Sequence, residues 1–259
     1  MQLGDHAGAG TPPYDIADAV RRGGARLGHR PAVTVLHPGA RYEQSGASLA
    51  NWATKGAHLL ELDHLVGPGG TVDLVAPACW TSASVALAAW WLGAAVHLDP
   101  AATVPTGSAP ARSASRAAAG TAAVRVQHET VVGTAGGGTI LLVGDGLDGG
   151  PTGSASAPVW THEAQPMPDA PPPAAAGADR LALTSDVRRW TQRELLALAD
   201  DLGDGVLGVE VDRVDPALAL VATAVRPFLT GHATVVLRDV GRDAAVAERV
   251  SVWCPASDG

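Results

Sequence analysis

The sequence predicts an α/β protein with a mixed, largely parallel sheet and helices on both of its faces. Three observations support this class. The chain has 259 residues, of which 46% are hydrophobic, so it can bury a sizeable core. A strand, a nearly apolar helix and a second strand follow one another between residues 71 and 98, and further strand and helix patterns alternate after them. Such alternation is typical of helices packed on a parallel sheet.

The first part of the chain predicts two helices and a hairpin. Apolar residues recur at helical spacing over 14–27. Two strand-like runs, 32–36 and 41–44, flank the turn residues Pro38 and Gly39 and predict a β-hairpin. Ser48 is a suitable N-cap for an amphipathic helix that runs to about Leu62.

The next segment predicts a βαβ unit. A turn rich in glycine leads into a short apolar strand over 71–76, and the helix expected over 81–93 is apolar on nearly all sides. Another strand follows over 94–98. Because a strand, a crossover helix and a strand normally form a right-handed unit, we expect the two strands to be parallel.

The middle of the chain predicts a domain boundary. Residues 101–122 are rich in Ala, Ser, Thr and Gly, which makes their order doubtful. Strand patterns return at 123–127 and 139–143. Seven of the 19 prolines then fall within 149–177, as expected for a loop or linker. We therefore expect a front α/β part over 1–148, a linker over 149–178 and a second α/β part over 179–259, which completes the same sheet or an adjoining one.

The last part of the chain predicts two more strands and two helices. A strand is expected over 180–184, and Thr191 with Glu194 forms a capping box for a helix to about Leu202. Asp215 and Pro216 start a helix that Pro227 should kink or end. A strand is expected over 234–237.

Composition excludes several kinds of partner. The 18 basic and 26 acidic residues give a net charge of −8, so nucleic acid is not expected to bind. The longest apolar run, 85–98, is shorter than the ~20 residues that a membrane span requires, and residues 1–13 contain no apolar stretch of a secretory signal. The two cysteines, Cys79 and Cys254, match no metal-ligand spacing, and Asp145 and Asp148 provide too few ligands for calcium. We expect a cytoplasmic protein without a metal site.

Four segments together resemble one family. Residues 91–100 (WLGAAVHLDP) resemble the second core motif of the adenylate-forming (AMP-dependent) synthetases, in which a helix ends at a glycine and the next strand closes with Asp-Pro. Residues 39–60 resemble the early hairpin and helix of that family, and 66–72 resemble the turn before its first large strand, with Gly70 in place of the usual acidic residue. Residues 215–237 resemble the helix and strand that follow its phosphate loop. The resemblance covers about two thirds of the chain and implies the fold of the N-terminal portion of that superfamily, in particular of a group of short uncharacterised actinobacterial proteins related to it.

The chemistry of that family depends on residues that this sequence lacks. The phosphate loop should contain glycines and a lysine, because backbone N–H groups and a cation hold the ATP phosphates. At the matching place Thr184, Ser185 and Asp186 are followed by Val187 and two arginines, and Asp186 brings a negative charge to the position of a phosphate. Arg188 or Arg189 could supply a cation, but without glycines the backbone cannot curl around the phosphate. The family's aromatic-Gly-x-Thr-Glu segment, its ribose-binding Asp and its C-terminal catalytic lysine do not occur before Gly259.

Few other residues are candidates for chemistry. The one lysine, Lys55, lies in the first amphipathic helix, where a solvated polar face explains it. His97 fits either a general base or a histidine satisfied by hydrogen bonds, and the second case is commoner. No catalytic residue is therefore assigned.

Three functions stay open. The leading hypothesis is a catalytically degenerate relative that binds a small molecule or a protein. The second is an acyl-adenylate-forming ligase that a partner chain completes, in which case ATP with magnesium, or AMP, would be the cofactor. The third is a structural or regulatory subunit that binds protein. If a ligand site remains, the carboxyl ends of parallel strands are its expected place. The candidate residues are Pro77, Cys79 and Trp80 for a substrate, and Thr184, Ser185 and Asp186 for a nucleotide.

Overall fold

The strands of the protein form two sheets. The computed structural model describes residues 11–99, 124–128, 138–144, 148–152, 157–175 and 177–256. The first sheet has the order β11-β9-β10-β1-β2 and the second has the order β6-β5-β3-β4-β7-β8. In each sheet the pairs are parallel except at one edge, where β2 pairs with β1 and β8 pairs with β7 in antiparallel fashion. The predicted mixed, largely parallel α/β class is confirmed, but the sheets number two.

The bounds of the strands show how the chain returns to each sheet. The first sheet consists of β1 (Pro31–His37), β2 (Ala40–Ser45), β9 (Leu207–Glu210), β10 (Thr234–Leu237) and β11 (Val252–Trp253). The second consists of β3 (Thr71–Val75), β4 (Ala95–Leu98), β5 (Val124–His128), β6 (Thr139–Val143), β7 (Leu181–Thr184) and β8 (Arg189–Thr191). Each sheet therefore contains strands from before and after the proline-rich stretch, and the division into domains at 149–178 stays a prediction.

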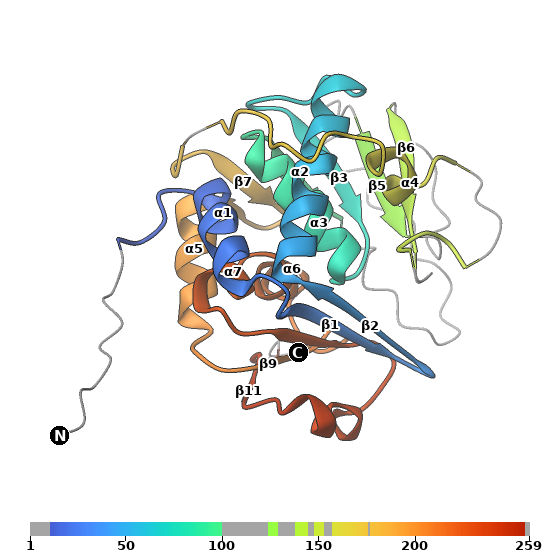
Figure 1. Cartoon of the computed structure of the whole chain (residues 1–259), viewed down its shortest axis with the longest axis vertical. Coiled ribbons are helices and arrows are strands. Elements are labelled where there is room, and N and C mark those ends of the chain that lie inside the picture. The colour runs from blue at the N-terminus through green and yellow to red at the C-terminus, as the bar shows by residue number, and fades with distance from the viewer. Residues whose placement is uncertain are drawn as a thin grey trace.

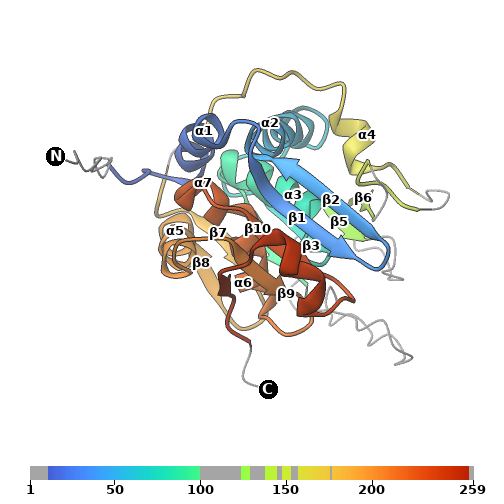
Figure 2. The ribbon, with the colours of Figure 1, turned by 60° about the horizontal axis from the view of Figure 1, so that its bottom comes forward.

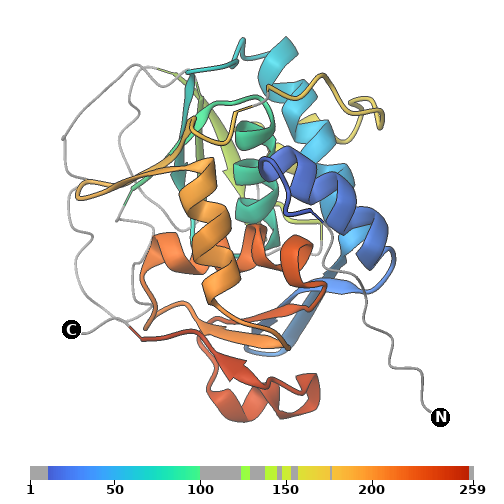
Figure 3. The ribbon, with the colours of Figure 1, turned by 90° about the vertical axis from the view of Figure 1, so that its left-hand side faces the viewer.

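Helices fill the space between and beside the sheets. They are α1 (Ile16–Leu27), α2 (Gly46–Leu62), α3 (Trp80–Trp91), α4 (Trp160–Ala164), α5 (Gln192–Asp201), α6 (Pro216–Ala224) and α7 (Arg226–Thr230), followed by a 3₁₀ helix at Arg242–Glu248. Figure 1 shows β3, β5, β6 and β7 of the second sheet in the upper part of the molecule, at the height of α1, α2 and α4, and β1, β2, β9 and β11 of the first sheet below them. Figure 2 shows β1, β2 and β10 on the near side of α3, and Figure 3 shows α5, α3, α1 and α2 standing along the second sheet.

The helix α3 is the centre of the core. Every residue of α3 is buried, because α1, α2 and α6 pack around it and β3 and β4 lie behind it. The predicted βαβ unit is confirmed, since β3 pairs with β4 in parallel with Thr71 opposite Ala95. One large hydrophobic cluster joins the second sheet, these helices and part of the first sheet, and two smaller clusters contain Leu207 and Val209 of β9 and Leu36, Val235 and Leu237 of β1 and β10.

Several expectations about the helix ends are confirmed and one is wrong. The capping box of Thr191 and Glu194 starts α5 as predicted. Asp215 caps α6, and the expected break occurs at Val225, where α6 gives way to α7 with Pro227 in its first turn. The predicted cap of α2 is wrong, because Ser45 rather than Ser48 accepts the N–H of the first turn. The Ser48 hydroxyl instead donates to Gln44 Oε1 at 2.5 Å.

Some elements had no clear sequence signal. The strands β8, β9 and β11 have only two to four residues each and lie among Gly, Asp and Arg, and α4 lies inside the proline-rich stretch. Residues 101–122, whose order was doubtful, fall outside the described residues. Among the helices that the structure describes, none combines the length and the apolar character needed to cross a bilayer.

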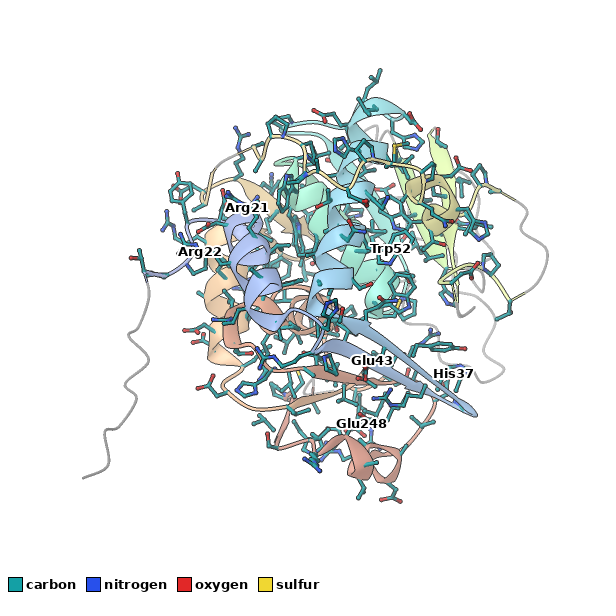
Figure 4. All side chains as sticks on the ribbon, in the orientation of Figure 1. Arg21, Arg22, His37, Glu43, Trp52 and Glu248 are labelled. Carbon is teal, nitrogen blue, oxygen red and sulfur yellow. The ribbon has the colours of Figure 1, made fainter. Side chains whose placement is uncertain are left out.

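An ion pair fastens the 3₁₀ helix to the first sheet. Arg41 on β2 donates from Nε to Glu248 Oε1 at 2.7 Å and from Nη2 to Oε2 at 3.1 Å. Figure 4 shows Glu248 below Glu43, next to the β1–β2 hairpin. The hydrogen bonds from Arg41 hold the pKa of Glu248 below its ordinary value of 4.5.

Replacing Glu248 by Gln should lower the free energy of unfolding at pH 7 by roughly 0.5–1 kcal/mol, because the pair is bidentate but half of Arg41 faces solvent. Because the pKa of Glu248 is lower in the folded than in the unfolded state, its ionised carboxylate stabilises the fold above pH 4.5. This contribution is lost as the pH falls through the pKa of the folded state. The difference between wild type and E248Q in urea unfolding should therefore shrink below pH 4.5. The control E61Q alters an exposed carboxylate on α2. It should unfold like wild type both at pH 7 and below pH 4.5.

Candidate functional site

A row of polar side chains crosses neighbouring strands of the second sheet. His97 on β4 lies opposite Thr184 on β7 and opposite Asp73 on β3, and Asp73 in turn lies opposite Arg125 on β5. His97 Nδ1 is 3.1 Å from Thr184 Oγ1, so this histidine has a hydrogen-bond partner. The register therefore places four polar side chains on the same face of neighbouring strands.

The charges in this row are largely paired. Arg125 Nη2 lies 3.3 Å from Asp99 Oδ2, and Arg125 Nε lies 3.9 Å from Asp73 Oδ2. Burial raises the pKa of Asp73, while His97 and Arg125 act in the opposite direction. Ionisable side chains therefore lie next to one another on β5, β3 and β4, and Thr184 on β7 extends the row.

The loop that the sequence resemblance assigned to the position of a phosphate loop closes on itself. Residues 185–188 join β7 to β8, and the Ser185 N–H donates to the Arg188 carbonyl at 2.8 Å. The Ser185 hydroxyl accepts the N–H groups of Val187 and Arg188 at 3.4 and 3.3 Å. Three of the four backbone N–H groups of this loop therefore have partners within it, and the side chain of Arg188 lies 5.0 Å from the centre of the Trp190 ring.

The other predicted segment, Pro77 to Trp80, lies two strands away at the same edge, since β4 separates β3 from β7. Ala78 packs with Leu207 and Val209 of the first sheet. Cys79 is buried and starts α3, where its N–H donates to Ser82 Oγ at 2.8 Å. This segment thus joins the two sheets, and Trp80 turns toward α2 rather than toward Thr184.

Trp80 lines a cavity between α2, α3 and α4. The cavity has a volume of about 250 Å³, and its other lining residues are Gln44, Trp52, Asp148, Thr161, His162 and Gln165. The ring centres of Trp52 and Trp80 are 5.9 Å apart and their planes are tilted by 46°. Figure 4 shows Trp52 on the side of α2 that faces α4. Neither Thr184, Ser185 nor Asp186 lines this cavity.

The polar side of the cavity comes from α4 and from the segment before it. His162 Nε2 lies 2.7 Å from Asp148 Oδ2, and this hydrogen bond, with that from the Gly150 N–H, holds the pKa of Asp148 below its usual range. Thr161 is 2% exposed, and its hydroxyl has no hydrogen-bond partner within the described part of the chain. Gly149 lies against Trp80, where a Cβ would come within 2.5 Å of the indole.

Sequence reasoning had assigned only Trp80 among the residues of this cavity. Trp52 was expected only as part of an apolar helical stripe, and Asp148 only as a weak calcium ligand. The contact of Asp148 with His162 joins residues 14 positions apart across a poorly patterned region, so no periodicity could have shown it. Asp145 falls outside the described residues.

The sequence analysis expected the one lysine of the chain, Lys55, on a solvated polar face, and this expectation is wrong. Lys55 Nζ donates to the carbonyls of Gln165 and Met167 at 2.9 and 2.6 Å and lies 3.0 Å from Asp169 Oδ1. Its side chain is only 14% exposed. Lys55 therefore fastens the segment 165–175 across α2.

The described residues offer no obvious reactive group or metal cage. No three of their His, Cys, Asp or Glu side chains come together as metal ligands. Both cysteines are free and buried, and burial raises the pKa of Cys254 to about 11. A thiol in that environment is a poor nucleophile at neutral pH.

Comparison with known proteins identifies the fold. The acyl-CoA synthetase of Brucella canis superposes with a TM-score of 0.65 at 14% identity, over 95% of this chain and 48% of that one. The N-terminal domain of FACL13 from Mycobacterium tuberculosis gives 0.63 at 12% identity, over 92% and 62%. A benzoate CoA ligase from Burkholderia xenovorans gives 0.61 at 14%, over 92% and 48%. The chain therefore has the fold of the N-terminal portion of these synthetases and spans about half the length of the full-length ones.

Sequence comparison adds one curated relative. The "TIGR03089 family protein" of Mycobacterium tuberculosis is 43% identical over 61 residues, which are 24% of this chain and 25% of that one. The matched segment is therefore a quarter of each protein. No protein-family model matches the chain.

Replacing Lys55 by Met should lower the free energy of unfolding by about 2 kcal/mol, because the hydrogen bonds of a largely buried ammonium group are lost while the apolar stem is kept. Limited proteolysis should then cut within 165–175 faster than in wild type. The matched control R193M removes an exposed ion pair to Asp179 and should change neither quantity appreciably. Equal proteolysis of K55M and wild type would contradict the anchoring role.

Proposed function

Given the fold of the N-terminal portion of acyl-CoA synthetases, we propose that this chain is a catalytically degenerate relative that binds a small ligand instead of activating one with ATP. The observation that carries the proposal is the closed loop at 185–188. A phosphate loop presents several free N–H groups and glycines toward the nucleotide. Here the N–H groups of Ser185, Val187 and Arg188 already bond to the Arg188 carbonyl or the Ser185 hydroxyl. Asp186 adds a negative charge to the loop.

The available cations support the same proposal. Lys55, the lysine of this chain, is bound to two carbonyls and to Asp169 across α2. Arg188 stacks over Trp190, and neither arginine of the loop follows a glycine. A phosphate at this loop would therefore meet Asp186 without a poised cation, and ATP would be repelled rather than held.

A titration of the purified chain with millimolar MgATP tests this proposal. We expect no rise in the melting temperature above about 1 °C, because a ligand without affinity for the native state does not stabilise it. We also expect no exchange of pyrophosphate into ATP with fatty or aromatic acids. A ligand present at 100 times its Kd would instead add about 2.7 kcal/mol and raise the melting temperature by about 5 °C or more.

Variants of the loop make the negative result informative. R188A and R189A should respond to MgATP as wild type does, which is not at all. If ATP stabilises the wild type and either variant removes the effect, then an arginine holds the phosphates and the proposal is wrong. That result would support a ligase completed by a partner chain.

A further inference from the structure

The outer face of α1 is strongly basic, although the whole chain has a net charge of −8. Residues 19–42 contain five arginines and no acidic residue. Four of these arginines lie exposed on α1 or just after its C-terminal end, namely Arg21, Arg22, Arg26 and Arg30. Figure 4 shows Arg21 and Arg22 beside α1, on the opposite side of α2 from Trp52. This face therefore reverses the overall charge of the protein locally.

Most of the positive charge on this face has no carboxylate partner. Within the described chain, Asp18 is the one carboxylate that pairs with it, at 2.7 Å from Arg22 and 3.7 Å from Arg21. Arg26 and Arg30 donate to backbone carbonyls instead. Four guanidinium groups against one carboxylate leave three positive charges unbalanced. More than half of the side chains of Arg21 and Arg22 faces solvent, so a partner can reach them.

A groove between α1 and α2 adjoins these arginines. Its volume is about 330 Å³, and Arg21 forms part of its wall. Small residues on both helices, among them Ala25 of α1 and Ala50 of α2, leave this space open, and the buried Trp91 lies beneath it. The groove therefore offers room for an apolar side chain next to a row of cations.

One polar group in the groove is unused. Thr54 lines the groove and is 6% exposed, and its hydroxyl makes no hydrogen bond within the described part of the chain. Unlike Thr161 Oγ1, this hydroxyl is not sealed from solvent, so it is available to a group that enters the groove. Asp169 also lines the groove, but Lys55 lies 3.0 Å from its carboxylate and compensates its charge.

These features favour a segment of protein over a lipid surface or a small anion. A helix that lies on a bilayer needs large apolar side chains toward the lipid, and the described residues of α1 expose none. The net charge of −8 also opposes an anionic bilayer. A small anion would meet Arg21 alone, because the arginines continue for roughly 10 Å along the helix. A segment with several carboxylates and one apolar residue meets both the row and the groove.

We infer that the basic face of α1 and the adjoining groove form a docking site for an acidic segment of another protein. The carboxylates of that segment pair with Arg21, Arg22, Arg26 and Arg30, and one of its apolar side chains enters the groove beside Ala25. This role goes beyond the binding of a small ligand and uses a different part of the molecule.

Fluorescence anisotropy with labelled heptapeptides tests the inference. A peptide of six glutamates around a central leucine should bind with a Kd on the order of 100 µM at about 50 mM NaCl, and about tenfold more weakly at about 300 mM. The same peptide with glutamines in place of the glutamates should bind at least about tenfold more weakly, because its charge is lost. A central glycine in place of the leucine should weaken binding about threefold to tenfold, because no apolar group then enters the groove.

Variants separate the charges from the groove. R21Q/R30Q should weaken binding of the leucine peptide about tenfold. The control R189Q/R213Q changes the net charge equally at exposed arginines outside α1 and should bind like wild type. A25L keeps every charge and fills the groove from an exposed position, so it should bind the leucine and the glycine peptides equally. Unchanged melting temperatures show that these variants are folded.

Four results would overturn the inference. Equal binding of the glutamate and glutamine peptides would remove the role of charge, and equal loss in R21Q/R30Q and R189Q/R213Q would make the attraction unspecific. Sedimentation with vesicles that contain about 30 mol% phosphatidylserine, abolished by R21Q/R30Q, would assign the face to a lipid surface. A dimer in size-exclusion chromatography that R21Q/R30Q dissociates would assign it to a second copy of this chain. No arm contains ATP, so each of these failures leaves the proposed function untouched.

Discussion

The complete burial of α3 is the constraint on which the rest of the fold depends. A helix that has no solvent-facing side must find a partner for each polar group and a neighbour for each apolar one. The residues from Trp80 to Trp91 meet this demand with alanines, which let other helices approach closely, and with short hydroxyl side chains that bond to their own helix, such as Ser84 to the Thr81 carbonyl at 2.7 Å. Larger side chains here would overpack the core.

Indole groups and one amide connect this helix to distant parts of the chain. Trp90 Nε1 donates to the Ala182 carbonyl on β7 and Trp91 Nε1 to the Pro172 carbonyl, while Trp160 on α4 donates to Ser84. The buried Gln192 accepts the Ile16 N–H and donates to the Trp90 carbonyl, so it joins the first helix, α3 and α5. The bonds of Trp91 to Pro172 and of Trp160 to Ser84 tie the position of the proline-rich segment to that of α3.

The same packing can hold this scaffold together without any contribution from a bound nucleotide. The fold that the chain shares with acyl-CoA synthetases covers 95% of its length, and its core is held by the burial of apolar side chains. The loop at 185–188 lies at the end of a hairpin and makes its own hydrogen bonds, so its sequence can change without disturbing the core. The cavity beside Trp80, in contrast, is built directly on the N-terminal end of α3 and on α4, and its walls are part of the core packing. The loop and the cavity thus differ in how closely each is tied to the core.

The sequence by itself determined the class of the fold and most of its elements, because hydrophobic periodicity, turn residues and caps are local properties. The βαβ unit around α3, the hairpin over 31–45 and the capping box at Thr191 follow from such patterns. Only the tertiary structure decided that the strands separate into two sheets, that Lys55 anchors a distant segment, and that Trp52, Trp80, Thr161 and Asp148 surround one cavity. These features join residues far apart in the chain through burial and individual hydrogen bonds, and neither the period nor the composition of any one segment carries that information.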